Sequence, residues 1–276
     1  MKTIDTIAEM QGIRHQLVEP VGFVPTMGHL HEGHLSLVKH ARAENATVVV
    51  SIFVNPTQFG HREDFQQYPR DIERDLALLE KENTDIVFTP STDEMYPPDF
   101  NSRVEVKEIT EPLEGAARPG HFRGVTTVVA KLFNIVQPDR AYFGQKDAQQ
   151  ALVIHKMVAD LNLNLGVVTL PTIREPDGLA MSSRNSYLNP EERRAAPVLY
   201  RSLKLAEQRW GQGTRDAARL REEMKALIQK EPRVEIDYIS IADAVTLEEL
   251  DEIKPPALVS LAVRIGKTRL IDNIVL

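Results

Sequence analysis

Three histidines lie close together in the stretch PTMGHLHEGHLSL. His29, His31 and His34 are interspersed with Gly28 and Gly33, a spacing that suits a phosphate-binding turn, a metal site or a loop without a function. A metal site would require all three imidazoles to converge, and no pattern of acidic partners supports it. We therefore favour phosphate binding by His31 and His34, and we interpret His29 as an exposed residue.

The hydrophobic pattern predicts the elements that position these histidines. Residues 21–26, VGFVPT, form a short apolar run typical of a buried strand, and residues 34–45 have helical spacing. The histidines therefore fall between the carboxyl end of a strand and the start of a helix, where open α/β sheets bind ligands. The free N–H groups of a helix N-terminus attract phosphate, and the two glycines let the backbone come close to it.

A second polar motif, SIFVNPTQFG, follows another apolar run that predicts a buried strand. Its Asn-Pro pair ends the strand, so Asn55 and Gln58 should lie at the same edge of the sheet as the histidines. The glutamine amide offers a donor and an acceptor, which suits a substrate with hydroxyl and carboxylate groups. An ordinary turn, in which Asn and Pro serve only the backbone, explains the motif equally well.

Two later motifs carry cations. FGQKDAQQ ends a predicted strand and opens a helix with Lys146, whose charge is unfavourable at a helix N-terminus and so suggests a phosphate partner. Asp147 beside it is most simply a helix N-cap. MSSR, residues 181–184, offers two hydroxyls and a guanidinium able to wrap a triphosphate, although the motif is weak by itself. The loop ARPGHFRGV is either a second anion-binding edge or a solvated loop; its basic residues are Arg118, His121 and Arg123.

The order of apolar runs predicts a fold with two domains. Up to residue 174 strands alternate with helices, which implies an α/β parallel sheet with helices on both faces. The predicted strands are 21–26, 47–54, 85–90, 140–144 and 165–173, and the predicted helices are 34–45, 70–83, 124–137 and 147–162. Residues 96–123 lack a clear period, and we expect a loop with short strand pieces near 104–106. We expect a smaller α+β C-terminal domain over residues 175–276; its helices are 190–209, capped by Asn189, and 214–230, and its strands are 234–243, 257–265 and 269–276.

Composition limits the classes of function. The formal net charge of −7 and the pI near 5.7 argue against a broad nucleic-acid or anionic-membrane surface. The chain has no cysteine, which excludes disulfides, thiolate nucleophiles and cysteine-ligated metals. No apolar stretch reaches the roughly 18 residues of a membrane helix. We expect a soluble, cytoplasmic protein without nucleic-acid or membrane partners.

Taken together and in this order, PTMGHLHEGH, SIFVNPTQF, YPR, FGQKDAQQ and GLAMSSRN resemble the pantoate–β-alanine ligase family of the HIGH-type nucleotidylyltransferases. The resemblance covers about residues 21–276. It implies a Rossmann-like first domain and a C-terminal lid domain. It also implies ATP-dependent condensation of pantoate with β-alanine through pantoyl adenylate, with Mg²⁺ accompanying ATP, in a homodimer formed through the first domain.

The resemblance also implies the roles of individual residues. His31, His34 and Lys146 would be catalytic, and Asp75 is a possible magnesium contact. The implied ATP-binding residues are Met27, Gly28, His31, Gly33, His34, Gly144, Gln145, Lys146, Asp147, Ile173, Met181, Ser182, Ser183 and Arg184. The implied substrate-binding residues are Pro25, Asn55, Gln58, Phe59, Tyr68 and Gln150. The family usually has Glu where this chain has Gln145, and we expect little consequence because the next two residues are retained.

Two other classes of function share part of this pattern. A nucleotidyltransferase of cofactor biosynthesis would use the same histidine motif, but it would not need the paired glutamines Gln58 and Gln150. A non-catalytic ATP sensor would bind the nucleotide without turning it over. Retention of all the polar motif residues argues against the sensor.

Overall fold

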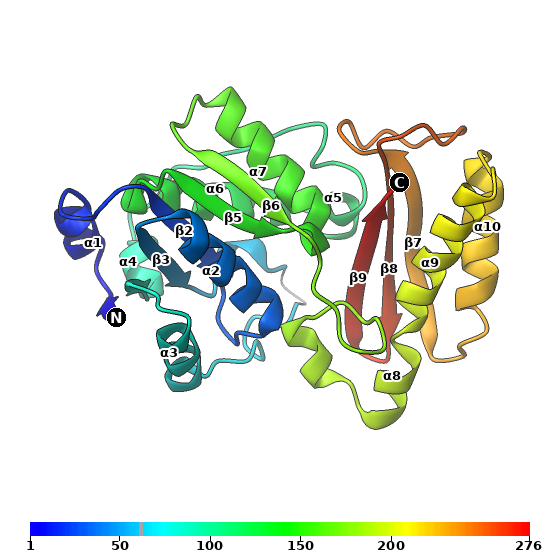
Figure 1. Cartoon of the computed structure of the whole chain (residues 1–276), viewed down its shortest axis with the longest axis horizontal. Helices are drawn as coiled ribbons and strands as arrows, with labels where there is room; N and C mark the ends of the chain where they lie inside the picture. The colour runs from blue at the N-terminus through cyan, green and yellow to red at the C-terminus, as the bar shows by residue number, and fades with distance from the viewer. Residues whose placement is uncertain (61–62) are drawn as a thin grey trace. The chain divides into compact units, whose positions relative to one another are not determined.

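A computed structural model describes residues 1–60 and 63–276 of the chain. Internal contacts divide it into two compact units, which Figure 1 shows with the labels used below. The first unit comprises Met1–Gly144 and Gln149–Pro171, and the second comprises Gln145–Ala148 and Thr172–Leu276. In this division a four-residue turn from the middle of the chain groups with the C-terminal unit, and a domain boundary at residue 174 stays a prediction.

The first unit is built on a six-stranded sheet in the order β1-β4-β3-β2-β5-β6, in which every pairing is parallel. Its strands are β1 (Lys2–Ile4), β2 (Val21–Thr26), β3 (Thr47–Ile52), β4 (Ile86–Phe88), β5 (Arg140–Gly144) and β6 (Gly166–Leu170). Its helices are α1 (Ile7–Arg14), α2 (Glu32–Glu44), α3 (Ile72–Lys81), α4 (Thr92–Met95), α5 (Glu114–Ala117), α6 (His121–Val136) and α7 (Ala148–Asp160). The predicted parallel sheet is confirmed, and the strand order reverses at β2, the position where such sheets bind ligands.

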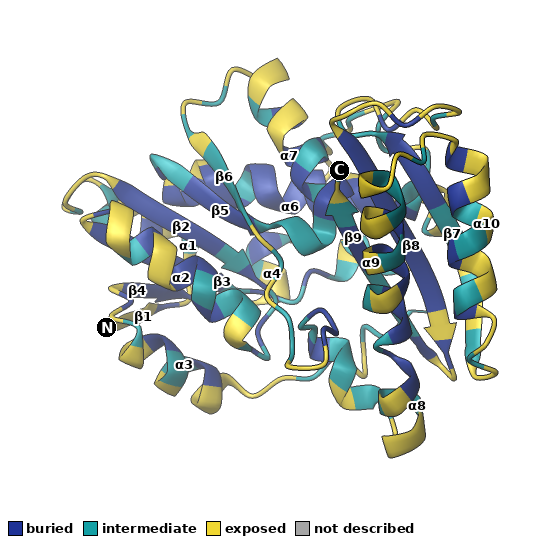
Figure 2. Cartoon of the chain, turned by 45° about the vertical axis from the view of Figure 1, so that its right-hand side comes forward, coloured by how far each residue is buried: buried dark blue, intermediate teal, exposed yellow. Residues whose placement is uncertain are grey.

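Successive side chains of the central strands point into two different apolar cores. Phe23 and Val49 pack in the cluster that contains Phe133 of α6, whereas Val24 and Val50 pack in the cluster of α2. This alternation follows from the two-residue period of a strand, and the continuous apolar runs of β2 and β3 reflect burial on both faces. Figure 2 shows both strands as largely buried. The helices therefore cover both faces of the sheet, as predicted.

The segment before α6 differs from the prediction. The expectation of strand pieces near residues 104–106 is wrong, because Val104 bonds to side chains of α6 instead of to a strand. Its N–H donates to Thr127 Oγ1 at 3.1 Å, and its carbonyl accepts from Thr126 Oγ1 at 2.6 Å. Helix α6 also begins at His121, three residues earlier than its apolar spacing indicated.

The second unit contains an antiparallel sheet in the order β7-β8-β9, covered by helices. The elements are α8 (Pro190–Ala195), α9 (Val198–Gly211), α10 (Ala217–Ile228), β7 (Val234–Asp243), β8 (Ala257–Ile265) and β9 (Thr268–Val275). Asn189 caps α8 as predicted and forms a capping box with Glu192. The single helix predicted over residues 190–209 is broken near Pro197, whose missing N–H cannot continue it.

Candidate active site

The two histidines assigned to phosphate binding lie together at the start of α2. His31 is the N-cap of this helix, and its Nδ1 accepts a hydrogen bond from the N–H of Gly33 at 3.1 Å. The ring of His34 lies 4.0 Å from that of His31, measured between centroids, at an interplanar angle of 31°. Because Nδ1 of His31 is an acceptor, a neutral His31 carries its proton on Nε2, which can donate to an anion.

Asp75 of α3 holds the backbone of the histidine loop. Its carboxylate accepts from the N–H of His29 at 2.6 Å and from the N–H of Leu30 at 2.8 Å, and the residue is only 1% exposed. Gly28 has φ +80°, and a Cβ there would lie 3.0 Å from Asp75 Oδ2. Burial raises the pKa of Asp75 although both hydrogen bonds oppose this change. Asp75 therefore acts on the shape of the loop, and a magnesium contact by it stays a prediction.

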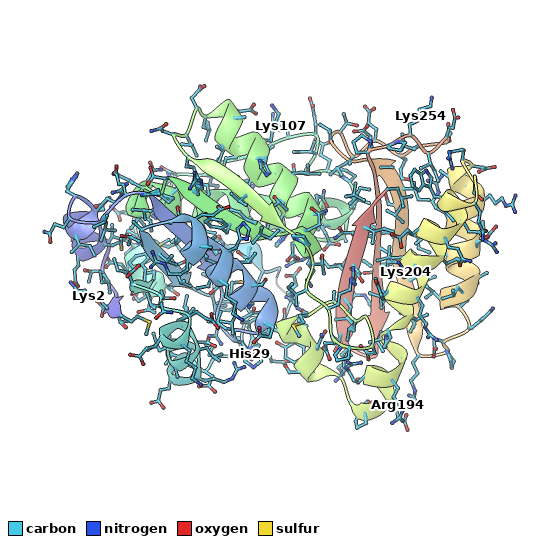
Figure 3. The ribbon with its side chains drawn as sticks, viewed as in Figure 1. Lys2, His29, Lys107, Arg194, Lys204 and Lys254 are labelled. Carbon is cyan, nitrogen blue, oxygen red and sulfur yellow. The ribbon has the colours of Figure 1, made fainter. Side chains whose placement is uncertain are left out.

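The three histidines do not assemble a metal site. In the described parts of the chain, no group of three or more His, Asp or Glu side chains is arranged to hold a metal ion. His29 instead has a left-handed backbone, with φ 50°, and its N–H is held by the carboxylate described above. Figure 3 labels His29 near α2. The structure therefore brings together His31 and His34 and gives His29 a backbone role.

The motif SIFVNPTQFG forms a short 3-10 helix, η1 (Pro56–Gln58), directly after β3. Asn55 is 1% exposed, and its Nδ2 donates to Gln58 Oε1 at 3.0 Å and to the carbonyl of Gly124 at 3.1 Å. Tyr96 donates its hydroxyl to Asn55 Oδ1 at 2.8 Å. Gln58 Nε2 lies 3.1 Å from Met27 Sδ. The amide of Gln58 thus lies beside the histidine loop in a fixed orientation.

The first turn of α6 fixes the backbone of Gln58. His121 Nδ1 lies 2.9 Å from the carbonyl oxygen of Gln58, and His121 Nε2 lies 3.1 Å from Arg118 Nη1. Because a guanidinium only donates, Nε2 accepts and Nδ1 carries the proton donated to Gln58. Burial, helped by the charge of Arg118, lowers the pKa of His121 to about 4. Arg118 also pairs with both carboxylate oxygens of Glu63, at 2.8 and 2.7 Å.

These contacts answer the two interpretations left open for ARPGHFRGV. Arg118 and His121 are neither a free anion-binding edge nor a solvated loop, because they hold the η1 turn. Arg123 is exposed. Gly124 allows the close approach of the two segments, since a Cβ there would lie 2.4 Å from the carbonyl oxygen of Thr57. Sequence reasoning missed this positioning role, although the Gly-His-x-x-Gly spacing before an apolar helix was a visible signal.

The other residues expected to bind substrate occupy varied environments. Phe59 and Tyr68 pack edge to face with ring centroids 6.0 Å apart. Pro25 is half-buried within β2, and Gln150 is half-buried in α7. The neighbouring Gln149 has a structural role, because its amide bonds to the backbone of Ile109, Pro112 and Glu114 at 2.9–3.0 Å. The side-chain amide of Gln149 is thus used within the fold, and substrate binding by Gln150 stays a prediction.

The second unit contains Lys146 and Arg184, the two cations that the sequence assigned to ATP binding. Lys146 lies in a 3-10 turn, η2 (Gln145–Asp147), and its Nζ is 3.3 Å from Asp147 Oδ1. Asn273 of β9 donates to the carbonyls of Gln145 and Lys146 at 3.0 and 2.8 Å. Gly144 is the last residue of β5, and a Cβ there would meet no atom within 4 Å. The turn is therefore held from the C-terminal strand.

The MSSR motif begins a further 3-10 helix, η3 (Ser183–Tyr187). Ser182 is its N-cap, and its Oγ accepts from the N–H of Arg184 at 3.3 Å. Met181 donates its N–H to the carbonyl of Ile173 at 3.0 Å, which joins the expected adenine-contacting residue to the motif. Ser183 is 7% exposed. Within this unit, the structure places Ile173 and residues 181–184 in one folded segment.

Comparison with known proteins gives a consistent family. A family profile described as Pantoate-beta-alanine ligase matches residues 2–275. A pantothenate synthetase from Roseiflexus castenholzii is 61% identical over 276 residues, covering 100% of this chain and 99% of the relative. One from Thermotoga neapolitana is 58% identical over 279 residues, covering 100% of both chains.

Solved structures agree with these relatives. The crystal structure of pantothenate synthetase from Thermus thermophilus superposes with a TM-score of 0.96 at 51% identity, covering 99% of each chain. A pantoate-β-alanine ligase from Francisella tularensis, complexed with β-γ ATP and β-alanine, superposes with a TM-score of 0.83 at 38% identity. This match covers 100% of the present chain and 97% of the other. In the described parts of the present chain, no helix is long and apolar enough to span a bilayer.

Proposed function

This chain belongs to the pantoate–β-alanine ligase family, and from this premise we propose which of its residues carry the reaction. The enzyme condenses pantoate with β-alanine at the expense of ATP, and it forms pantothenate, AMP and pyrophosphate through pantoyl adenylate. The observation that supports our assignment best is the contact between the rings of His31 and His34 at the start of α2, with the amide of Gln58 beside the same loop.

The reaction needs positioning and charge stabilisation more than strong acid–base catalysis. In the first step a carboxylate oxygen of pantoate bonds to the α-phosphorus of ATP, and the bond to pyrophosphate breaks. Carboxylates titrate near pH 4, so this nucleophile is already ionised at neutral pH. In the second step the neutral amine of β-alanine bonds to the acyl carbon, the bond to AMP breaks, and the proton lost by the nitrogen passes to solvent. The protein contributes alignment and fixed charges.

In the first unit, the histidine loop binds the triphosphate. His31 donates through Nε2, because its Nδ1 accepts from the helix backbone. The side chain of His34 adds a further donor, and the partial positive charge of the α2 N-terminus favours the anion. Backbone atoms of Met27, Gly28 and Gly33 line the same loop. The metal enters as Mg·ATP, since Mg²⁺ is commonly held by substrate phosphates with only one or two carboxylates.

Pantoate binds through its hydroxyl and carboxylate groups to the two glutamine amides. Gln58 is oriented for this by Asn55, which holds its Oε1 and leaves the other amide atom toward the histidine loop. Gln150 supplies the second amide. Apolar and aromatic contacts come from Pro25, Phe59 and Tyr68. Exclusion of water by these residues protects the mixed anhydride from hydrolysis.

The second unit supplies the remaining charge stabilisation. Lys146, Ser182, Ser183 and Arg184 contact the phosphates and the leaving pyrophosphate. Backbone atoms of Ile173 contact adenine. The other nucleotide contacts are Gln145, Asp147 and Met181 of this unit, together with Gly144 at the end of β5 in the first unit. We also propose that residues 175–276 act as a lid domain, that the enzyme is a homodimer, and that it works in the cytoplasm.

The function is tested by AMP release from Mg·ATP with pantoate and β-alanine supplied separately and together. Rapid AMP release only with both substrates identifies the ligase, and pantoate-dependent exchange of pyrophosphate into ATP reports the adenylate step. A nucleotidyltransferase would keep AMP attached to its product, and a sensor would bind ATP without turnover. Either result would refute the ligase function.

The residue assignment is tested by His34→Ala and Lys146→Ala. Each should lower pantoate-dependent exchange by about 100-fold or more, the usual effect of removing one group that stabilises developing charge. The matched controls are His40→Ala, exposed on the same helix α2, and Lys156→Ala, exposed on α7. Near-normal exchange in both test variants would contradict the assignment.

A further inference from the structure

We infer that Asp272 and Asn273, adjacent residues of the C-terminal strand β9, position the two phosphate-binding segments of the second unit. The inference rests on the function proposed above and adds two positioning residues to it. Neither residue belongs to a motif singled out in the sequence. Their signal is local: two consecutive polar residues, 2% and 4% exposed, interrupt the apolar run of RLIDNIVL.

Asn273 uses its whole side-chain amide on the turn that carries Lys146. Its Nδ2 donates to the carbonyl of Gln145 at 3.0 Å and to the carbonyl of Lys146 at 2.8 Å. Its Oδ1 accepts from Gln145 Nε2 at 3.2 Å. Because two consecutive carbonyls are fixed by one buried amide, the peptide plane between Gln145 and Lys146 cannot rotate freely. The direction in which the lysine side chain leaves the turn is therefore set by Asn273.

Asp272 fixes the start of the segment that leads to MSSR. Its carboxylate forms a bidentate pair with Arg174, at 2.6 and 2.9 Å. Arg174 Nη1 also donates to the carbonyl of Gly178 at 3.1 Å, and its guanidinium lies 4.1 Å from the centroid of the Tyr200 ring. Gly178 has φ +92°, and a Cβ there would lie 2.1 Å from Tyr200 Cδ1. This bend is thus held on one side by an ion pair and on the other by an aromatic ring.

The two residues are also coupled to each other. The N–H of Asn273 donates to Asp272 Oδ1 at 2.8 Å. The carboxylate of Asp272 therefore binds both the guanidinium of Arg174 and the backbone of Asn273. Burial raises the pKa of Asp272, while the hydrogen bonds and charge of Arg174 and the positive charge of Lys146 lower it. The positive charge of Lys146 therefore acts on the carboxylate of Asp272.

Stability alone is a poor explanation for such a cluster. A buried ion pair can often be replaced by apolar residues of similar volume without loss of stability. Asp272 faces Leu261 and Asn273 faces Ser260 on the neighbouring strand β8, positions where apolar residues would pack. What apolar side chains could not do is hold two carbonyls and a guanidinium in fixed directions.

The test is a double-mutant cycle on pantoate-dependent exchange of pyrophosphate into ATP. Asn273→Ala should lower the exchange rate by about 100-fold, the effect of misplacing a catalytic group by about 1 Å. In the Lys146→Ala background the same substitution should change the rate by less than about threefold, because the group it positions is gone. Ser260→Ala is the matched control, since Ser260 is buried opposite Asn273 and its Oγ has no hydrogen-bond partner among the described residues.

A second variant keeps the test decisive if Asn273→Ala folds poorly. Asn273→Thr suits a strand, and its single hydroxyl can replace at most one of the two donated hydrogen bonds. It should lower the rate by about tenfold while far-UV circular dichroism matches that of Ser260→Ala. The inference would be overturned if Asn273→Ala lowered the exchange rate by the same factor in the wild-type and the Lys146→Ala backgrounds. It would also be overturned if Asn273→Ala and Asn273→Thr both had a normal exchange rate. A normal rate in Lys146→Ala alone would refute the proposed role of that lysine.

Discussion

Asp75 offers the sharpest test of how the histidine loop is held. Substituting Asp75→Ala removes both acceptors of the N–H groups of His29 and Leu30, which lie 2.6 and 2.8 Å from the carboxylate. Hydrogen bonds to a charged group contribute about 1.5–3 kcal/mol each, so the gross loss is about 3–6 kcal/mol. The raised pKa of Asp75 shows that burial of the charge opposes part of this gain. We therefore expect a net loss of about 3 kcal/mol in the local stability of the loop.

Amide hydrogen exchange measures this loss where it occurs. About 3 kcal/mol corresponds to roughly a 100-fold faster exchange of the amides of His29 and Leu30. Asp75→Asn keeps one acceptor and faces the other N–H with an amide donor, so it should accelerate exchange by roughly 30-fold. The rate of pantoate-dependent pyrophosphate–ATP exchange should fall by about 10- to 100-fold, with the larger loss in Asp75→Ala and the smaller in Asp75→Asn.

The control is Glu73→Gln, which removes a negative charge from the same first turn of α3 at an exposed position. It preserves the helix and separates the loss of the buried hydrogen bonds from the loss of charge near the helix N-terminus. If loop protection in Asp75→Asn equals that in Glu73→Gln, the carboxylate does not hold the loop and the reasoning is refuted.

Three further results are expected. Burial and the charge of Arg118 lower the pKa of His121 to about 4 from 6.5, so the unfolded chain binds the proton more tightly and the free energy of unfolding falls as the pH drops from 6.5 to 4. His121→Asn can still donate to Gln58 but does not titrate. Urea unfolding at pH 7 and at pH 4.5 should therefore show a fall in the free energy of unfolding that is about 2–3 kcal/mol smaller in this variant. Gly124→Ala should raise the KM for pantoate about tenfold, because its Cβ would lie 2.4 Å from a carbonyl of the η1 turn. Arg174→Met should lower the free energy of unfolding of the second unit by about 3–5 kcal/mol, as followed by Trp210 fluorescence, because Asp272 would be buried without its cation.

Each of these expectations has a specific contrary outcome. An unchanged slope of stability with pH in His121→Asn would show that this histidine does not carry the effect. Gly12→Ala is the control for Gly124, because it lies within a helix with open space around it and should leave the KM unchanged. Adding Asp272→Asn to Arg174→Met should recover part of the lost stability, and no recovery would mean that the unpaired charge is not the cause.

The sequence was sufficient wherever the pattern was local. The apolar runs of β2 and β3 identified the central strands, and the Asn189-Pro190 pair identified the start of α8. The strand–loop–helix unit around His31 and His34 followed from the same reasoning. In each case the signal and the structure it predicts lie within a few residues of each other, so periodicity and capping rules apply directly.

The positioning contacts of Asp75, His121 and Asn273 were not predicted, because the partners of these residues are distant in the chain. Asp75 acts on residues about 46 positions away, His121 on one 63 away, and Asn273 on one 127 away. A buried acid on an amphipathic helix, or two polar residues within an apolar strand, signals that some partner exists. Neither pattern identifies the partner, because that depends on how the elements pack. The prediction of strand pieces near residues 104–106 was wrong for a related reason. Threonine side chains of α6, and not a neighbouring strand, form the hydrogen bonds to this backbone.

The grouping of Gln145–Ala148 with the C-terminal unit affects how the gene could be divided. The chain passes from one unit to the other after Gly144, after Ala148 and after Pro171, so no single cut separates the two units. A fragment beginning at Thr172 would contain β9 but not the turn that Asn273 binds, and the side-chain amide would lose its hydrogen bonds to Gln145 and Lys146. Complementation between separately expressed halves should therefore require a C-terminal fragment that is extended, or supplied in trans, with residues 145–148. Modularity in this enzyme thus follows spatial contacts and not the linear order of its residues.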